Sequence, residues 1–268
     1  MMRILKQDEL FSLIMSLLPQ KPCIVEVGAY IGNHTLKFIK KCPDSTIFSF
    51  EPVPEIYQAL QKNVANYPNI YLFNQAVSNT NDFGELYIAQ HPIRLRQGHG
   101  GQASGREKKL CSASSLLKPQ NRLNFSPIVY DKTITVETIT LDMWYKSTFA
   151  KASSFTKVSA DKSAVYPSEP WRNRDGVATP NNTLHISIDL LWIDAQGYEY
   201  EILEGAKNML SQVKYIHTEV HFNQAYENQK DYTEVIEFLK KYNFTEIARD
   251  FNNIDDWFFG NILFKKSA

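Results

Sequence analysis

The sequence predicts an α/β protein with a mostly parallel sheet and helices on both faces. Short apolar runs alternate with longer helical patterns between Cys23 and Asn66, and the same alternation returns between Leu190 and Tyr242. This alternation is typical of βαβ units. With 268 residues, 43% of them hydrophobic, the chain is long enough to bury a large core without disulfides or structural metals.

The expected elements follow one another in a regular order. An amphipathic helix is expected first, over about 4–18, ending at Pro19. The expected strands are 24–27, 46–50, 70–73, 190–193 and 215–220, and the expected helices are 33–41, 52–66, 199–210 and 231–242. Proline suits the start of the 52–66 helix because the first turn leaves its N–H groups without partners. The tail, 244–248 and 257–264, predicts a terminal hairpin.

Two stretches interrupt this order, and we interpret them as flexible insertions in one domain spanning 1–268. Residues 91–109 hold four glycines and five basic residues, and residues 146–185 are rich in serine, alanine and lysine. We favour inserted sequence over a substrate lid because the amino-acid sequences of both stretches resemble translated repeat elements found inside some bacterial genes. The two stretches carry charges of +4 and +3, which leaves about −7 on the remaining core.

Overall composition excludes several function classes. The 29 basic residues balance 29 acidic ones, whereas dedicated nucleic-acid binders usually carry a basic excess. Three widely spaced cysteines indicate neither a disulfide framework nor a zinc knuckle, which favours a reducing compartment. No apolar run approaches the roughly 20 residues that cross a bilayer. We therefore expect a cytoplasmic protein that binds neither nucleic acid nor membrane, and the oligomeric state stays open.

The first candidate site is the turn E-V-G-A-Y-I-G from Glu26, placed between a strand and a helix. Its glycines allow close approach of a ligand to the backbone. Dinucleotide-binding turns follow G-x-G-x-x-G and present N–H groups to a diphosphate. Here the two glycines are four residues apart and Glu26 precedes them, which would repel a diphosphate. The turn suits a ligand with a positive centre, such as the sulfonium and amino group of S-adenosylmethionine.

Two further acids end apolar strands. Glu51 follows the second strand, where an acid can accept hydrogen bonds from both hydroxyls of a ribose, although the dipole of the next helix could also explain it. Asp194 ends the run from Leu190, and Gly197 permits the turn that follows it. Glu199 falls in the first turn of the next helix, so its role stays open. The carboxyl ends of parallel strands share one edge, so we expect Glu26, Glu51 and Asp194 to lie together.

Six stretches carry a resemblance to a known family. They are V-E-V-G-A-Y-I-G from Val25, F-E-P-V-P-E from Phe50, N-Q-A-V-S-N from Asn74, T-L-D from Thr140, L-W-I-D-A-Q-G-Y-E-Y-E-I-L-E-G-A from Leu191 and H-T-E-V from His217. In this order and spacing the chain resembles the FkbM family of class I S-adenosylmethionine-dependent methyltransferases. The resemblance implies a seven-stranded Rossmann-like sheet with a terminal antiparallel hairpin, and methyl transfer to hydroxyls of sugars and related metabolites.

The resemblance also implies roles for individual residues. By position, the methionine part of the donor would be framed by Glu26, Gly28 and Gly32. The ribose would be bound by Glu51, and the adenine side of the site would be formed by Ala76 and Val77. The chain departs from the family where Trp192 replaces a common lysine and Gln196 a frequent glutamate. These two changes bear on acceptor chemistry rather than on donor binding.

Methyl transfer to an alcohol needs a base within hydrogen-bond reach, and the candidates are Asp194, Glu219 and His221. His217, Glu219 and His221 alternate along one expected strand and would share a face. At about 3.3 Å per residue the two histidines are about 13 Å apart, too far to bind one ion. We therefore expect no metal.

The leading hypothesis is an S-adenosylmethionine-dependent methyltransferase that acts on a hydroxyl of a sugar, glycoconjugate or small metabolite. One alternative is a nicotinamide-dependent oxidoreductase that uses Glu51 on its ribose, against which the acid at position 26 and the missing G-x-G-x-x-G count. The other is a non-catalytic binding module with a methyltransferase fold, which Trp192 and Gln196 keep open.

Overall fold

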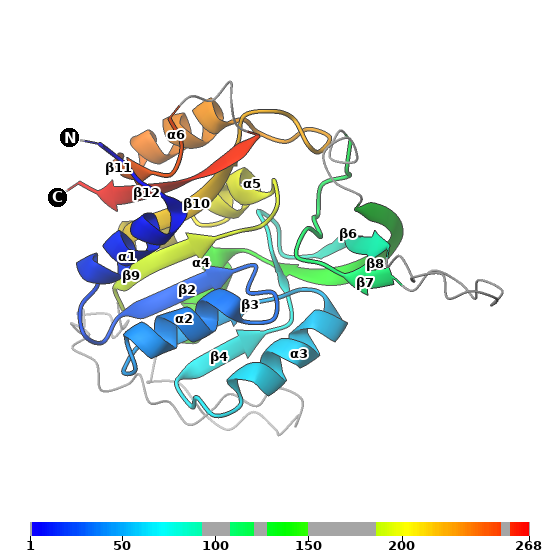
Figure 1. The fold of residues 1–268 in the computed structure, drawn as a ribbon, viewed down its shortest axis with the longest axis horizontal. Coiled ribbons are helices and arrows are strands. Elements are labelled where there is room, and N and C mark those ends of the chain that lie inside the picture. Colours follow the sequence, from blue (N-terminus) through cyan, green and yellow to red (C-terminus); the bar gives the residue numbers. More distant parts are fainter. Residues whose placement is uncertain (1, 93–107, 121–127, 150–185, 253–257, 268) are drawn as a thin grey trace, which may run out of the picture.

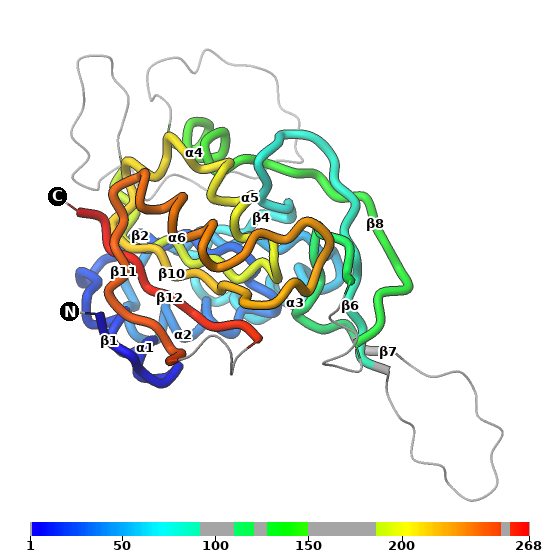
Figure 2. The backbone as a smooth tube through the Cα atoms, turned by 90° about the horizontal axis from the view of Figure 1, so that it is seen from above, coloured from blue at the N-terminus to red at the C-terminus, as the bar shows by residue number. Residues whose placement is uncertain are grey.

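The computed structural model describes residues 2–92, 108–120, 128–149, 186–252 and 258–267, and its fold is drawn in Figure 1 and Figure 2. A central sheet carries helices on both sides, and a smaller sheet lies beside it near the ends of β2 and β3 (Figure 1). None of the helices in these ranges is long and apolar enough to cross a membrane.

The main sheet has eight strands. In spatial order they are β1 (Arg3–Ile4), β11 (Phe244–Arg249), β12 (Phe259–Lys266), β10 (Val213–His221), β9 (Ile188–Ile193), β2 (Cys23–Val27), β3 (Thr46–Phe50) and β4 (Ile70–Phe73). All neighbours pair in parallel except β12, which is antiparallel to both β10 and β11. The parallel sheet and its terminal antiparallel hairpin are thus confirmed, and the two-residue β1 adds an eighth strand at the edge.

Helices cover both faces of this sheet, as predicted. On one face α1 (Gln7–Leu17) and α2 (Asn33–Lys41) pack on Ile24 and Leu190, with α3 (Pro54–Val64) beside α2. The other face is covered by α4 (Leu141–Phe149), α5 (Glu199–Glu204) and α6 (Tyr232–Lys241). Successive strand residues point to opposite faces, so Ile24 joins the first layer and Val25 the second. Apolar packing on both faces explains why these strands read as continuous apolar runs.

Two expected boundaries were wrong. The first helix begins at Gln7 rather than near residue 4, because Arg3–Ile4 pairs with β11. The helix expected over 199–210 ends at Glu204, and a 3₁₀ turn, η3 (Met209–Gln212), follows. The residue after it, Gly205, must be glycine because a Cβ there would lie 2.1 Å from the Ser78 carbonyl oxygen.

The second sheet was not predicted. Its strands are β5 (Ala76–Val77), β8 (Val129–Ile139), β6 (Phe83–Pro92) and β7 (Lys108–Leu110), in that order. The expected insertion 91–109 therefore begins and ends in strands, and 93–107 lies outside the described residues. The expected insertion 146–185 likewise begins inside α4, and 150–185 lies outside them. One face of the second sheet packs on α3 through Leu86 and Ile56, and so closes one side of the site described next.

Candidate active site

The carboxyl ends of β2, β3 and β9 surround a cavity of about 210 Å³. Five residues expected to bind ligand or act in catalysis line it: Gly28, Glu51, Ala76, Val77 and Asp194. Four others do not line it, namely Glu26, Gly32, Glu219 and His221. The structure thus brings Glu51 and Asp194 together on the cavity wall. Glu26 does not lie on that wall.

The glycine turn is fixed by its neighbours. The N–H groups of Gly28 and Ala29 donate to the Phe50 carbonyl at 3.1 and 2.9 Å. Gly28 has φ of 84°, and a Cβ there would lie 1.9 Å from the carbonyl oxygen of Asp194. Gly32 also has a positive φ, 90°, where it caps α2. Both glycines are therefore required by backbone conformation, and Gly28 also by close contact with the β9 turn.

Glu26 lies beneath this turn rather than on the cavity wall. Its Oε2 accepts hydrogen bonds from Thr35 Oγ1 at 2.6 Å and Ser49 Oγ at 2.7 Å. Burial raises the pKa of Glu26 to about 7, although the two hydroxyls act in the opposite direction. The carboxyl group therefore ties α2 and β3 to the turn.

Glu51 lies on the wall and is held by two backbone donors. Tyr30 N donates to its Oε2 and Val53 N to its Oε1, both at 2.9 Å. Burial raises the pKa of Glu51 to about 7, and the two N–H groups lower it in part. The carboxylate is thus fixed in orientation at the edge of the cavity, with Ala76 and Val77 also on the wall.

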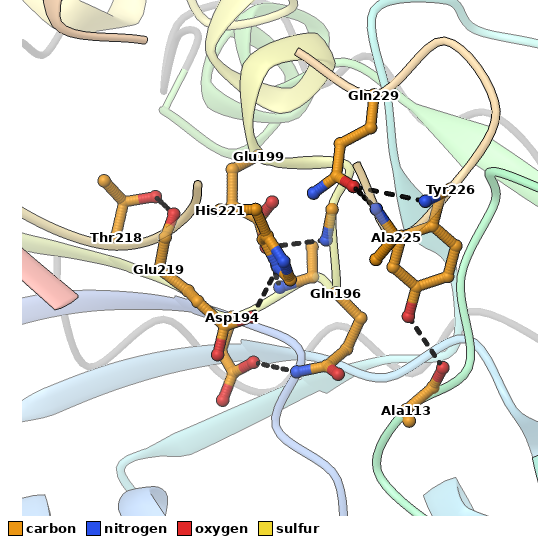
Figure 3. A network of polar contacts seen from close by, with 12 residues as sticks. Ala113, Asp194, Gln196, Glu199, Thr218, Glu219, His221, Ala225, Tyr226 and Gln229 are labelled. Carbon is orange, nitrogen blue, oxygen red and sulfur yellow. Dashed lines mark hydrogen bonds and ion pairs between the residues drawn. The ribbon is translucent and has the colours of Figure 1, made fainter. Parts of the chain in front are cut away.

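Asp194 forms another part of the wall, and Gln196 Nε2 donates to its Oδ1 at 2.7 Å (Figure 3). His34, in the first turn of α2, lines the same cavity and was missed by the sequence analysis. Burial lowers the pKa of His34, and the charge of Asp194 opposes that shift. A histidine in the first helical turn after a ligand-binding turn was the signal that could have found it. Tyr198, whose hydroxyl is 3.0 Å from Ser78 Oγ, is a second missed wall residue.

Glu219 and His221, at the end of β10, form a separate buried group. His221 Nε2 lies 2.8 Å from Glu219 Oε1. Glu199 joins them from α5, and its Oε1 accepts hydrogen bonds from the N–H groups of Ala195 and Gly197 at 3.0 and 3.2 Å (Figure 3). Burial raises the pKa of Glu199 to about 7, with His221 opposing the shift and Glu219 reinforcing it.

His217 does not join this group. Its ring stacks on Trp192 with centroids 3.5 Å apart and planes 11° apart. Burial lowers the pKa of His217 to about 3, so this ring is neutral near pH 7. The expectation that His217 is an internal histidine agrees with this position.

Two segments, 111–120 and 222–231, meet over one side of the site, and we call them the roof. Gln120 N donates to the Ala225 carbonyl at 3.0 Å, and Glu227 N donates to the Lys118 carbonyl at 2.8 Å. Tyr226 contributes a further bond from its hydroxyl to the Ala113 carbonyl at 3.3 Å (Figure 3). The roof thus joins the second sheet to the chain that follows β10, and Ser112 and Ser115 from it line the cavity.

Three features together define a class I methyltransferase. They are the parallel sheet with its antiparallel C-terminal strand β12, the glycine turn after β2, and the acid at the end of β3. Residues 26–246 match the Methyltransferase FkbM domain, and the chain belongs to that family. It is therefore an S-adenosylmethionine-dependent methyltransferase, as the resemblance in its motifs implied.

Individual relatives agree with this assignment. The chain is 25% identical over 231 residues to 2-O-methyltransferase NoeI of Sinorhizobium fredii (strain NBRC 101917 / NGR234), covering 85% of this chain and 76% of that protein. A stretch of 48 residues, 18% of each chain, is 44% identical to Methyltransferase sdnD of Sordaria araneosa. A crystal structure from Clostridium thermocellum, provisionally described as an rRNA methylase, has a TM-score of 0.50 at 8% identity over 100% of this chain and 99% of that one. The last likeness shows a shared fold.

Proposed function

We propose that this enzyme transfers the methyl group of S-adenosylmethionine to a hydroxyl of a sugar, glycoconjugate or small metabolite. The observation that carries the proposal is that Asp194 lies on the wall of the cavity that Glu51 and Gly28 also line. A ribose-binding acid and a candidate base thus face one space. The similarity to a protein named 2-O-methyltransferase supports oxygen as the acceptor atom.

The residues present fit the donor. Apolar side chains, among them Phe50, Val77 and Leu86, offer a surface for a flat base. Glu51 offers carboxylate oxygens to the ribose hydroxyls, and the backbone of Gly28 lines the same wall. S-adenosylmethionine supplies an electrophilic methyl group when it is bound there.

The chain's own residues position the reactants and move one proton. Holding a nucleophile and an electrophile in a productive geometry can lower the barrier by about 7–11 kcal/mol. We assign the base to Asp194, which would accept the hydroxyl proton at a carboxylate oxygen as the oxygen attacks. The hydrogen bond from Gln196 Nε2 to Oδ1 holds the carboxylate in place for that role. Glu219 and His221 lie off the cavity wall, so we do not give them this role.

The proposal is tested by combining ligand stabilisation with methyl transfer. S-adenosylmethionine and S-adenosylhomocysteine at 100 times their dissociation constants should each stabilise the protein by about 2.7 kcal/mol. That gain corresponds to a rise of roughly 5–10 °C in melting temperature, and NAD should give none. Labelled methyl groups should then appear on the oxygen of glycosides in an acceptor panel. Binding of both adenosyl ligands without transfer to any hydroxyl would favour a non-catalytic binding module, and a shift with NAD alone would contradict the assignment.

Donor binding should depend on pH through Glu51. Ribose hydroxyls donate to the ionised carboxylate, so binding favours the deprotonated form of a group whose pKa is raised to about 7 in the free protein. The dissociation constant for S-adenosylmethionine should be constant above about pH 8 and about tenfold higher at pH 6. Calorimetric titrations across this range measure it. Glu51→Gln should bind more weakly and without this pH dependence, whereas an equal slope in the variant would assign the proton to another group.

A further inference from the structure

We infer that Glu199, Glu219 and His221 form a binding site for a divalent transition-metal ion such as Mn²⁺ or Zn²⁺. Each residue offers one ligand atom, and these three atoms lie within 4.8 Å of one another. They come from two elements, the first residue of α5 and the carboxyl end of β10. The site is distinct from the cavity, because none of the three lines it.

The spacing of the ligand atoms suits one ion. Glu219 and His221 are two residues apart on β10, so their side chains leave the same face. Glu219 Oε1 and His221 Nε2 are 2.8 Å apart. Adjacent ligands at about 2.1 Å from a six-coordinate ion are about 3 Å apart. Only small side-chain shifts would therefore place an ion between them.

Charge and burial favour a cation at this position. Glu199, Glu219 and His221 are exposed by only 3%, 7% and 3%. Two carboxylates buried together are costly, and one imidazolium offsets one of the two charges. A divalent ion offsets both and binds the imidazole in its neutral form.

The surroundings supply supports of the kind that metal ligands have. Two backbone N–H groups fix the Glu199 carboxylate, as described above. Gln229 Oε1 accepts hydrogen bonds from the N–H groups of Ala225 and Tyr226 at 2.8 and 3.2 Å, which fixes the orientation of its amide. Its Nε2 is buried with no hydrogen-bond partner among the described residues, and Figure 3 shows it on the side of Glu199 and His221. The N–H groups of Gln229 Nε2 are placed to donate a hydrogen bond to a metal-bound water or to the non-ligating oxygen of a ligating carboxylate.

The donor set also indicates the class of ion. One imidazole and two carboxylates suit Mn²⁺, Fe²⁺ or Zn²⁺ better than Ca²⁺, which prefers oxygen ligands throughout. No metal was expected from the sequence because His217, Glu219 and His221 of β10 alone cannot bind one ion. The third ligand, Glu199, reaches the end of that strand from α5.

The test is direct metal binding by the purified full chain after treatment with a chelator. Titration with Mn²⁺, followed by electron paramagnetic resonance of the free ion, should show one bound ion per chain, and Mn²⁺ or Zn²⁺ should raise the melting temperature. Glu199→Gln and Glu219→Gln should each weaken binding by at least about tenfold. Glu204→Gln removes the same charge from the same helix at a side chain paired with Lys207, and it should bind as the wild type does.

The glutamine variants keep an acceptor oxygen, so the backbone bonds to Glu199 can persist and the fold can be checked by circular dichroism. Absence of stoichiometric binding in the wild type would overturn the inference and leave a buried His–Glu network. Equal binding by wild type and both variants would overturn it as well. Because the readout is binding, the result is independent of whether methyl transfer to a hydroxyl is observed.

Discussion

Gly28→Ala should lower the melting temperature by at least about 5 °C and abolish binding of S-adenosylmethionine. The new Cβ would lie 1.9 Å from the Asp194 carbonyl oxygen, and φ at this position is 84°. A side chain held at positive φ costs about 1–3 kcal/mol. Forcing the β9 turn away costs about 1–3 kcal/mol more. Thermal unfolding and calorimetric titration measure the two effects.

Gly84→Ala is the matched control for this change. A Cβ there would meet only side-chain methyl groups, those of Leu116 at 3.0 Å and Thr138 at 3.1 Å, which can shift. Its melting temperature should stay within about 3 °C of the wild type. A Gly28→Ala protein as stable as the Gly84→Ala protein would show that the turn does not contact β9 as described.

Asp194→Asn should lower kcat by about 10² to 10⁴-fold while leaving the affinity for S-adenosylmethionine within about threefold. The asparagine Oδ1 can still accept the hydrogen bond from Gln196, so the local structure is kept and the basic oxygen is lost. Steady-state kinetics with an identified acceptor, together with donor titration, separates the two quantities.

Glu51→Gln provides the opposite pattern for comparison. It should raise the dissociation constant of the donor and change kcat little once the donor is saturating. If Asp194→Asn keeps most of the wild-type kcat, the base is another group on the wall, and His34 is the next to test because it lines the same cavity.

The sequence predicted the central sheet closely because burial on both faces imposes a strong local pattern. The strands at Thr46–Phe50 and Ile70–Phe73 and the helix at Asn33–Lys41 agree with the structure to the residue. The second sheet was missed because β8 holds consecutive exposed residues, among them Asp131 and Lys132, before exposed and buried residues alternate from Ile134 to Thr138. Such strands are stabilised by partners distant in sequence, and a local apolar run does not mark them.

The candidate site was predicted in part for a related reason. Acids at strand ends share one edge in any parallel sheet, so Glu51 and Asp194 could be placed together without a structure. Glu26 could not be distinguished from them, because only the hydroxyls of Thr35 and Ser49 reveal that it lies beneath the turn. Glu199 lies close to His221 because of the path that the chain takes between β9 and β10. That path could not be predicted from the residue types alone.

The position of β12 between β10 and β11 bears on how the protein is made. During synthesis β10 and β11 emerge first, and the strand that separates them in the sheet, Phe259–Lys266, comes last. Until then β10 presents an unpaired edge, and such edges recruit other chains. Nascent chains stalled or cut before residue 259 should therefore be aggregation-prone and depend on chaperones, although the residues that line the cavity are already complete.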